Sequence, residues 1–257
     1  MNPKTPRFVW HELMTTDPAA ASAFYQAVIG WTAADSGMKD RSYTYLSAGT
    51  TPIGGLMAIP ESALAMGAGP GWVGYIGVDD IEARAARVTA AGGAMHHPVE
   101  QIPGIGRFSV MADPQGAAFL LFQPDTPAPP AEGAPSAPGH VGWNELRATD
   151  YASAFAFYER IFGWTKVEEM DMGPAGIYLM FATGGTAVGG FANKTAEMPA
   201  PSWCYYFNVD AIDDAMRRVV RHGGEVVGGP HEVPGGSWIA DCVDPQGASF
   251  SIVAPKR

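Results

Sequence analysis

The sequence predicts an α+β protein made of four βαβββ modules, paired into two domains. Two repeats support this fold class. Residues 10–17 (WHELMTTD) return as residues 143–150 (WNELRATD), and the turn at 113–116 (DPQG) returns unchanged at 244–247. Matches that recur in the same order along both halves indicate a duplicated chain. A weaker repeat inside each half, a strand followed by Asp, an amphipathic segment and Gly, raises the module count from two to four.

The helices are predicted from four Asp and Gly pairs with equal spacing. Asp accepts hydrogen bonds from free N–H groups at a helix start, and Gly adopts the left-handed conformation that often ends a helix. The pairs are Asp17 and Gly30, Asp80 and Gly93, Asp150 and Gly163, and Asp210 and Gly223.

Short β-like runs follow each helix. The first-half runs are residues 42–46, the glycine-broken 53–56 and the final strand 117–122, and the second-half runs are 176–181, 188–191 and 248–253. The glycine pairs 54–55 and 189–190 suit either a close approach of a ligand to the backbone or a sharp bend of the sheet. We therefore expect strands on both sides of each helix.

The domain boundaries follow from composition. We expect a first domain at residues 1–123, a linker at 124–139 and a second domain at 140–257. The linker is rich in Pro and Ala, which favours extended polyproline II structure and offers little to bury. Whether modules pair within a half or across halves stays open.

The charge and cysteine content narrow the function classes. The 257 residues carry a formal net charge of −10, which disfavours nucleic acid or an anionic membrane as partner. Cys204 and Cys242 lack metal-site spacing. No apolar run approaches the roughly 18 residues that span a bilayer. We expect a cytoplasmic protein, a monomer or a homodimer, with a small-molecule partner.

These motifs resemble the vicinal-oxygen-chelate superfamily of glyoxalase I, bleomycin-resistance proteins and extradiol dioxygenases, and the resemblance covers nearly the whole chain. Its carriers are Asp17, Phe24-Tyr25, Gly30-Trp31, the run Tyr75–Asp80 with Gly92-Gly93, the turn at 113–116, and their second-half copies. The tandem form is similar to bacterial two-domain glyoxalase-like proteins. The resemblance implies two glyoxalase-like domains, each a curved mixed sheet with helices outside and a concave small-molecule site.

The resemblance also implies a metal site of His, Glu or Gln ligands at four places in each half. In this chain those places hold Trp10 and Trp143, Val73 and Cys204, Leu120 and Ser251, and the stretches 51–57 and 186–192, which lack His, Asp and Glu. A divalent ion of this kind needs about three converging ligands. We therefore expect no metal or other cofactor. A one-residue register slip would turn His11 inward and make it the candidate ligand; otherwise His11 lies on the other face with a local partner.

Strand alternation supplies the candidate ligand-binding residues. Trp10, Glu12 and Met14 share one face, as do Trp143, Glu145 and Arg147. Glu12 and Glu145 are candidates for acid/base catalysis, or they only accept structural hydrogen bonds; Arg147 can pair with Glu145. Aromatic residues are expected to wall the pocket, and the site set includes Tyr45, Trp72, Tyr178, Trp203 and Tyr205.

The predicted function is binding of a small, aromatic or apolar molecule without the usual metal of the family. The alternative is a glyoxalase- or dioxygenase-type metalloenzyme, a lyase or a relative of one, whose non-standard ligand set includes His11 and Glu12. The sequence leaves open whether the protein is an enzyme.

Overall fold

A computed structural model describes residues 5–38, 42–126 and 136–257. The first half contains β1 (Phe8–Thr15), α1 (Pro18–Ile29), β2 (Thr32–Asp35), β3 (Thr44–Ala48), β4 (Thr51–Ala58), α2 (Glu61–Ala65), β5 (Gly71–Gly77), α3 (Ile81–Ala90), β6 (Ala94–Ile102), β7 (Gly106–Ala112) and β8 (Ala118–Pro124). The second half contains β9 (Val141–Ala148), α4 (Tyr151–Phe162), β10 (Thr165–Asp171), η1 (Gly173–Ala175), β11 (Ile177–Thr183), β12 (Thr186–Asn193), β13 (Ser202–Asn208), α5 (Ile212–Arg221), β14 (Glu225–Glu232), β15 (Trp238–Val243) and β16 (Ser249–Ala254).

The strands form two eight-stranded sheets. Their orders are β2-β3-β4-β1-β5-β8-β7-β6 and β10-β11-β12-β9-β13-β16-β15-β14, so the second sheet repeats the first. Within a module the first strand pairs in parallel with the last, as β1 does with β4, and the remaining pairs are antiparallel. The predicted α+β class with mixed sheets is confirmed. The predicted βαβββ order includes the edge strands β2 and β10, although their residues were not singled out, whereas the helix α2 was not expected.

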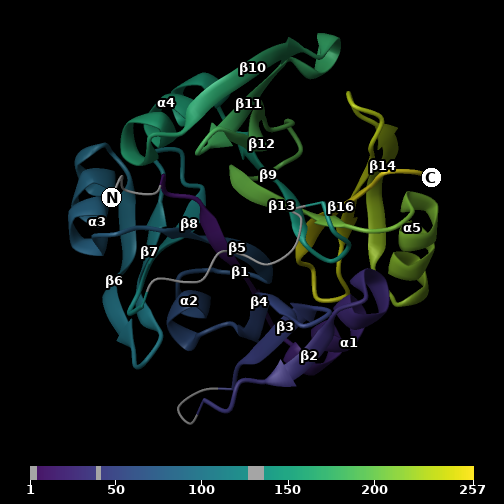
Figure 1. Cartoon of the computed structure of the whole chain (residues 1–257), viewed down its shortest axis with the longest axis horizontal. Coiled ribbons are helices and arrows are strands. Elements are labelled where there is room, and N and C mark those ends of the chain that lie inside the picture. The colour runs from purple at the N-terminus through teal and green to yellow at the C-terminus, as the bar shows by residue number, and fades with distance from the viewer. Residues whose placement is uncertain (1–4, 39–41, 127–135) are drawn as a thin grey trace. The chain divides into compact units, whose positions relative to one another are not determined.

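Contacts divide the chain into two compact units, each of which combines modules from both halves. Unit 1 comprises the described residues of Met1–Val9, Val73–Ala131 and Trp143–Trp203, and unit 2 those of Trp10–Trp72, Glu132–Gly142 and Cys204–Arg257. In unit 1, α3 packs on β6 and β7, and α4 packs on β12 (Figure 1). In unit 2, α5 packs on β14 and β15. A sheet therefore belongs to one half of the chain, whereas a compact unit draws on both halves.

The helix ends follow the predicted caps with two exceptions. Asp17 and Asp150 cap α1 and α4 by accepting from the N–H three residues on, and Gly30 and Gly163 end these helices in the left-handed conformation. Asp80 likewise caps α3.

The predicted end of α3 and the predicted start of α5 were wrong by one residue. Gly92, not Gly93, is the residue with positive φ after α3. Ala211, not Asp210, is the N-cap of α5, and no side chain caps that helix. Asp213 and Asp214 lie in its first turn, where carboxylates favour the positive end of the helix dipole.

Each unit has an aromatic core held by one buried carboxylate. In unit 1, Tyr158 donates to Asp113 at 3.2 Å and accepts from the Trp203 indole at 3.0 Å. In unit 2, Tyr25 and Asp244 form the same bond at 3.2 Å. Asp113 also accepts from two N–H groups of its own turn. The DPQG turn of the first half therefore bonds to α4, and the DPQG turn of the second half bonds to α1.

The linker prediction falls mostly on residues 127–135, which lie outside the described residues. No described helix is long and apolar enough to cross a membrane.

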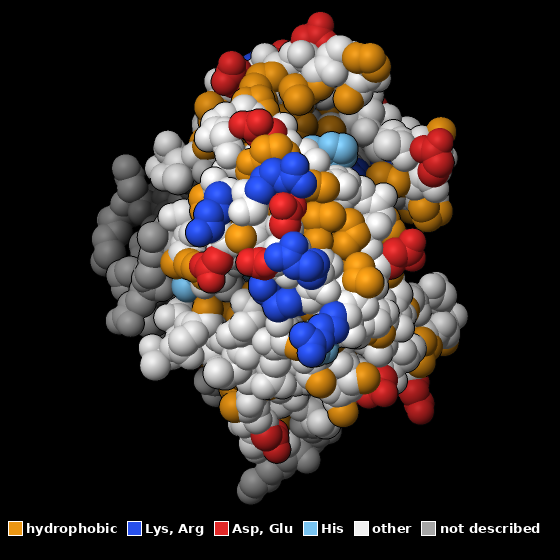
Figure 2. All heavy atoms as spheres, turned by 90° about the vertical axis from the view of Figure 1, so that its right-hand side faces the viewer, with side chains coloured by type: hydrophobic (Ala, Val, Ile, Leu, Met, Phe, Trp, Pro, Cys, Tyr) orange, Lys and Arg blue, Asp and Glu red, His pale blue; other side chains and the backbone are white. Residues whose placement is uncertain are grey.

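The face seen in Figure 2 gathers basic side chains among acidic and hydrophobic ones. Helix α5 carries two exposed arginines, Arg217 and Arg221.

Candidate functional site

An indole, a phenol and a carboxylate form a hydrogen-bonded cluster on β9 and β11, in unit 1. Trp143 Nε1 donates to the Tyr178 hydroxyl at 2.7 Å, and that hydroxyl donates to Glu145 Oε2 at 3.0 Å. Arg147 Nε donates to Glu145 Oε1 at 2.9 Å. We call these four residues the second-half cluster. The predicted pairing of Arg147 with Glu145 is confirmed.

Strand geometry and a glycine bring the members of this cluster together. Trp143, Glu145 and Arg147 alternate along β9 and so share a face, while Glu145 lies beside Gly190 in the parallel pairing with β12. A Cβ on Gly190 would overlap the ring of Tyr178, which reaches from β11 across this glycine to Glu145. The glycine pair therefore allows close approach of a tyrosine ring of this chain.

The first half repeats this arrangement in unit 2. Trp10 Nε1 donates to the Tyr43 hydroxyl at 2.9 Å, and Tyr43 is hydrogen-bonded to Glu12. A Cβ on Gly55 would overlap the Tyr43 hydroxyl. Tyr45 adds an edge contact to both rings, with centroids 6.1 Å from Trp10 and 5.7 Å from Tyr43. We call Trp10, Glu12, Tyr43 and Tyr45 the first-half cluster.

The two cluster tyrosines are held as neutral phenols. Burial raises the pKa of Tyr43 and of Tyr178 well above the usual value, and the neighbouring Glu12 or Glu145 carboxylate raises each further. The indole hydrogen bond opposes this shift only in part. Each phenol therefore keeps its proton at neutral pH and donates a hydrogen bond to the glutamate.

The clusters account for most of the predicted site residues and add one. The residue added is Tyr43, which was not in the predicted site set. Its signal in the sequence is its position, since Tyr43 precedes Gly55 by the same spacing that separates Tyr178 from Gly190. Met14 shares the face of Trp10 and Glu12 and corresponds to Arg147, so the two clusters differ in charged groups.

Three predicted wall residues do not join the clusters. Trp72 is buried and donates to the Tyr25 hydroxyl at 2.8 Å, in the core of unit 2. Trp203 is buried among Tyr158 and Trp164 in the core of unit 1. Tyr205 is also buried. All three occupy the alternate positions of β5 and β13 that face the helices.

His11 lies on the strand face opposite Glu12. Its ring contacts Tyr205 edge to face with centroids 4.7 Å apart, and it is buried. The register of β1 with β4 runs from His11 opposite Gly54 to Thr15 opposite Ala58 without a bulge. The register slip that would turn His11 inward in place of Trp10 is therefore absent.

The donors at the metal-ligand places of the family do not fit a divalent ion. Trp10 and Trp143 hold the first place in each half, and Val73 and Leu120 are buried apolar side chains. Across residues 5–38, 42–126 and 136–257 no three His, Cys, Asp or Glu side chains converge.

Cys204 and Ser251, at the second and third places of the second half, belong to unit 2. Cys204 Sγ lies 3.0 Å from Ser251 Oγ, and Ser251 donates to Asp241. One thiol, one hydroxyl and one carboxylate, already bonded to each other, fall short of the usual set of three hard or borderline ligands.

Comparison with solved structures identifies the fold. The Mn(II)-bound glyoxalase from Novosphingobium aromaticivorans has a TM-score of 0.65 and 16% identity, over 99% of this chain and 83% of that chain. The 2,3-dioxygenase LapB from Pseudomonas sp. KL28 has a TM-score of 0.68 and 15% identity, over 99% and 93%. At these identities the likeness establishes the architecture alone.

Sequence relatives extend over nearly the whole chain. CFP32 from Mycobacterium tuberculosis, whose name assigns it provisionally to the glyoxylases, is 32% identical over 250 residues, which cover 96% of this chain and 94% of CFP32. The anthracycline biosynthesis protein DnrV from Streptomyces peucetius is 33% identical, over 95% and 91%.

Family models match both halves separately. Residues 10–122 match the glyoxalase-like domain. Residues 138–252 match the glyoxalase/bleomycin resistance protein/dioxygenase superfamily. With the repeated sheets and the full-length relatives, these matches establish that the chain is a two-domain member of the vicinal-oxygen-chelate superfamily.

Proposed function

We propose that the protein binds a planar aromatic small molecule at the second-half cluster, and a related one at the first-half cluster, without the metal of the family. The observation that carries this proposal is the repeated indole–phenol–carboxylate arrangement. It includes the strand positions, Trp10 and Trp143, at which metal-using relatives carry their first ligand. Two copies that keep the same arrangement after diverging elsewhere favour a common role.

The aromatic rings supply the binding surface for such a ligand. Trp10, Tyr45 and Trp143 are half-buried, so part of each ring remains accessible. Their positions are fixed, because each indole N–H is bonded to a tyrosine hydroxyl. A fixed ring loses little conformational entropy when a flat ligand stacks on it, and such contacts contribute about 0.5–1.5 kcal/mol each.

The glutamates supply the polar anchor. Glu145 accepts one hydrogen bond at each oxygen, from Tyr178 and Arg147. A carboxylate has about four lone-pair sites, so it can accept a further hydroxyl from a ligand. A hydroxylated ring therefore suits this cluster. The first-half cluster has Met14 at the position of Arg147. It therefore suits a ligand whose edge at this position is less polar.

The relatives narrow the ligand class. Anthracyclines are hydroxylated, fused-ring aromatic compounds, and two Streptomyces relatives are named anthracycline biosynthesis proteins. We extend this chemistry to the present chain as a class, a hydroxylated polycyclic aromatic. An enzyme reaction at Glu12 or Glu145 is the alternative use of the same clusters.

The test is titration with 2,6-dihydroxyanthraquinone, whose hydroxyls have no internal acceptor, followed by quenching of tryptophan fluorescence. We expect Trp143→Ala to weaken binding about tenfold or more, and 1 mM EDTA to leave binding unchanged. Val220→Ala, at an exposed site on α5, is the matched control. Equal affinity of wild type and Trp143→Ala, or loss of binding with EDTA, would contradict the proposal.

Glu145→Gln separates binding from catalysis. If the cluster only binds, the variant weakens affinity for the hydroxylated probe but not for unsubstituted anthraquinone, and neither compound is converted. If Glu145 is a catalytic base, wild type converts the hydroxylated probe and the variant retains binding without turnover. Product analysis by mass spectrometry distinguishes the two results.

A further inference from the structure

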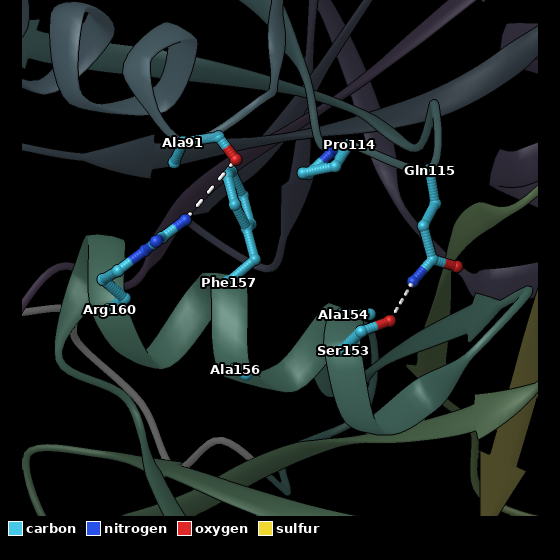
Figure 3. Close-up of a pocket in the computed structure, with 8 residues that line it drawn as sticks. All are labelled: Ala91, Pro114, Gln115, Ser153, Ala154, Ala156, Phe157 and Arg160. Atoms are coloured by element: carbon cyan, nitrogen blue, oxygen red, sulfur yellow. Dashed lines mark hydrogen bonds between the residues drawn. The ribbon is translucent and has the colours of Figure 1, made fainter.

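Unit 1 contains a cavity of about 400 Å³ outside the second-half cluster. It lies between α4 and the DPQG turn that joins β7 to β8 (Figure 3). Its lining residues are Ala91, Pro114, Gln115, Ser153, Ala154, Ala156, Phe157 and Arg160. The volume falls within the usual range of small-molecule sites.

One end of the cavity is closed by saturated polar groups. The Gln115 amide oxygen accepts from the N–H groups of Thr149 and Asp150. Its nitrogen donates to the Asp150 carbonyl and to Ser153 Oγ, a bond visible in Figure 3. These groups shape a wall, because their hydrogen-bonding capacity is already used within the protein.

The other end carries a cation with spare donors. Arg160 Nη2 donates to the Ala91 carbonyl at 3.4 Å, and within the described chain no carboxylate lies within ion-pair distance of this guanidinium. A guanidinium has five N–H donors, so most of those of Arg160 remain available. Figure 3 shows this side chain beside the Phe157 ring, on the far side of the cavity from Gln115.

Two more arginines add positive charge nearby. Arg87 Nη2 donates to the Arg160 carbonyl at 2.7 Å, and Arg84 donates to the Ile161 carbonyl. Both satisfy carbonyl groups in the last turn of α4, where cations oppose the negative end of the helix dipole. Arg160 is the arginine that lines the cavity, and Arg84 and Arg87 hold the turn of α4 that carries it.

Between the two ends the surface is apolar. Phe157, Ala154 and Pro114 line it, and Ala156 lies along the same side of α4. A single cationic end beside an apolar body complements a molecule with one carboxylate and a hydrophobic group.

We propose that this cavity binds an amphipathic monocarboxylate, with the carboxylate on Arg160 and the apolar body over Phe157 and Pro114. Arg binds a carboxylate through two parallel N–H donors, which fixes the orientation of the ligand. The site is separate from the second-half cluster, and its occupation does not depend on the function proposed for that cluster.

The repeat supplies an internal comparison. In unit 2, Ala27 occupies the position that corresponds to Arg160, and His222 that of Ala91. Phe24, the counterpart of Phe157, packs so closely on Gly224 that a Cβ there would lie 2.8 Å from its ring. The corresponding Gly93 has Val88 and Ala112 as its nearest neighbours instead. The chain is therefore expected to hold one such site, in unit 1.

The experiment is isothermal titration of the full chain with cyclohexanecarboxylate, whose saturated ring is not a ligand of the planar aromatic class proposed for the clusters. We expect one bound cyclohexanecarboxylate per chain, and at least tenfold weaker binding to Arg160→Gln. The neutral cyclohexylmethanol should bind wild type weakly and lose nothing in the variant. Arg221→Gln, an exposed arginine on α5, is the matched control and should bind as wild type does.

A second variant tests the cavity itself. Ala156→Trp fills the apolar side and keeps Arg160, so it should abolish binding while far-UV circular dichroism stays unchanged. Trp143→Ala should bind cyclohexanecarboxylate as wild type does, because the second-half cluster is not involved. Equal affinity of wild type and Arg160→Gln, or loss of binding in Trp143→Ala, would overturn the proposal.

Discussion

Tyr178→Phe tests whether the second-half cluster is held by its central hydroxyl. The substitution removes one oxygen atom, which accepts from Trp143 at 2.7 Å and donates to Glu145 at 3.0 Å. A bond to a charged group contributes about 1.5–3 kcal/mol and a neutral one about 1 kcal/mol. Water can take the place of the lost hydroxyl in part of these hydrogen bonds, because Trp143 and Tyr178 are only half-buried. We expect the free energy of unfolding to fall by about 2 kcal/mol.

The measurement is guanidinium denaturation, followed by circular dichroism and by tryptophan fluorescence. Coincident transitions are needed before the midpoints are converted to free energies. Tyr43→Phe should cost a similar amount, because Tyr43 holds the same position between Trp10 and Glu12. Tyr45→Phe is the control, since Tyr45 contacts Trp10 and Tyr43 through its ring, which the substitution keeps.

A double-mutant cycle isolates the bond between Tyr178 and Glu145. Each single variant, Tyr178→Phe or Glu145→Gln, removes or weakens the same contact, so the double variant should cost less than the sum of the two. The coupling should reach about 1 kcal/mol. A Tyr178→Phe effect within about 0.5 kcal/mol of that of Tyr45→Phe would refute the argument that this hydroxyl organises the cluster.

Three further predictions follow from the same contacts. Gly190→Ala and Gly55→Ala should each destabilise the chain by about 1–3 kcal/mol in denaturant titrations, because the added Cβ overlaps a tyrosine; wild-type midpoints would contradict this. Burial raises the pKa of Asp113 and Asp244 above 3.8, so the folded chain holds protons that the unfolded chain has released, and the free energy of unfolding falls as pH rises through that window. Replacing both by Asn should flatten this fall in stability at pH values above 3.8 in thermal melts; an unchanged slope would assign it to other groups. Burial raises the pKa of Cys242 to about 12, so this thiol should react with iodoacetamide at pH 8 only after unfolding, as peptide mass spectrometry can check; rapid labelling of the native chain would show the burial to be incomplete.

Local rules predicted the repeated elements well. Asp17, Asp80 and Asp150 cap helices as expected, because a cap depends on residues within one turn. The α5 start was missed because Asp210 and Ala211 differ by one position, which a spacing rule cannot resolve. The regrouping of modules across halves was left open, since it depends on contacts between residues far apart in the chain.

Strand alternation predicted the members of the two clusters that lie on β1 and β9. It places Glu12 and Glu145 beside their tryptophans and Arg147 beside Glu145. The sequence could not show which face of the sheet Trp203 and Tyr205 occupy. Adjacent residues of β13 face opposite sides, and aromatic residues stand at both kinds of position, so residue type does not show which side faces the core. The contact of Tyr43 with Gly55 joins β3 to β4 through a ring, and only its counterpart in the repeat could have indicated it.

The bond between Tyr25 and Asp244 has a consequence for how the chain is synthesised. Tyr25 is made 219 residues before Asp244. The part of its ring that Phe207 and Phe250 contact must therefore wait until those later residues have emerged. A ribosome stalled before β13 should hold a nascent chain that binds chaperones through α1, and separately expressed halves should associate when mixed.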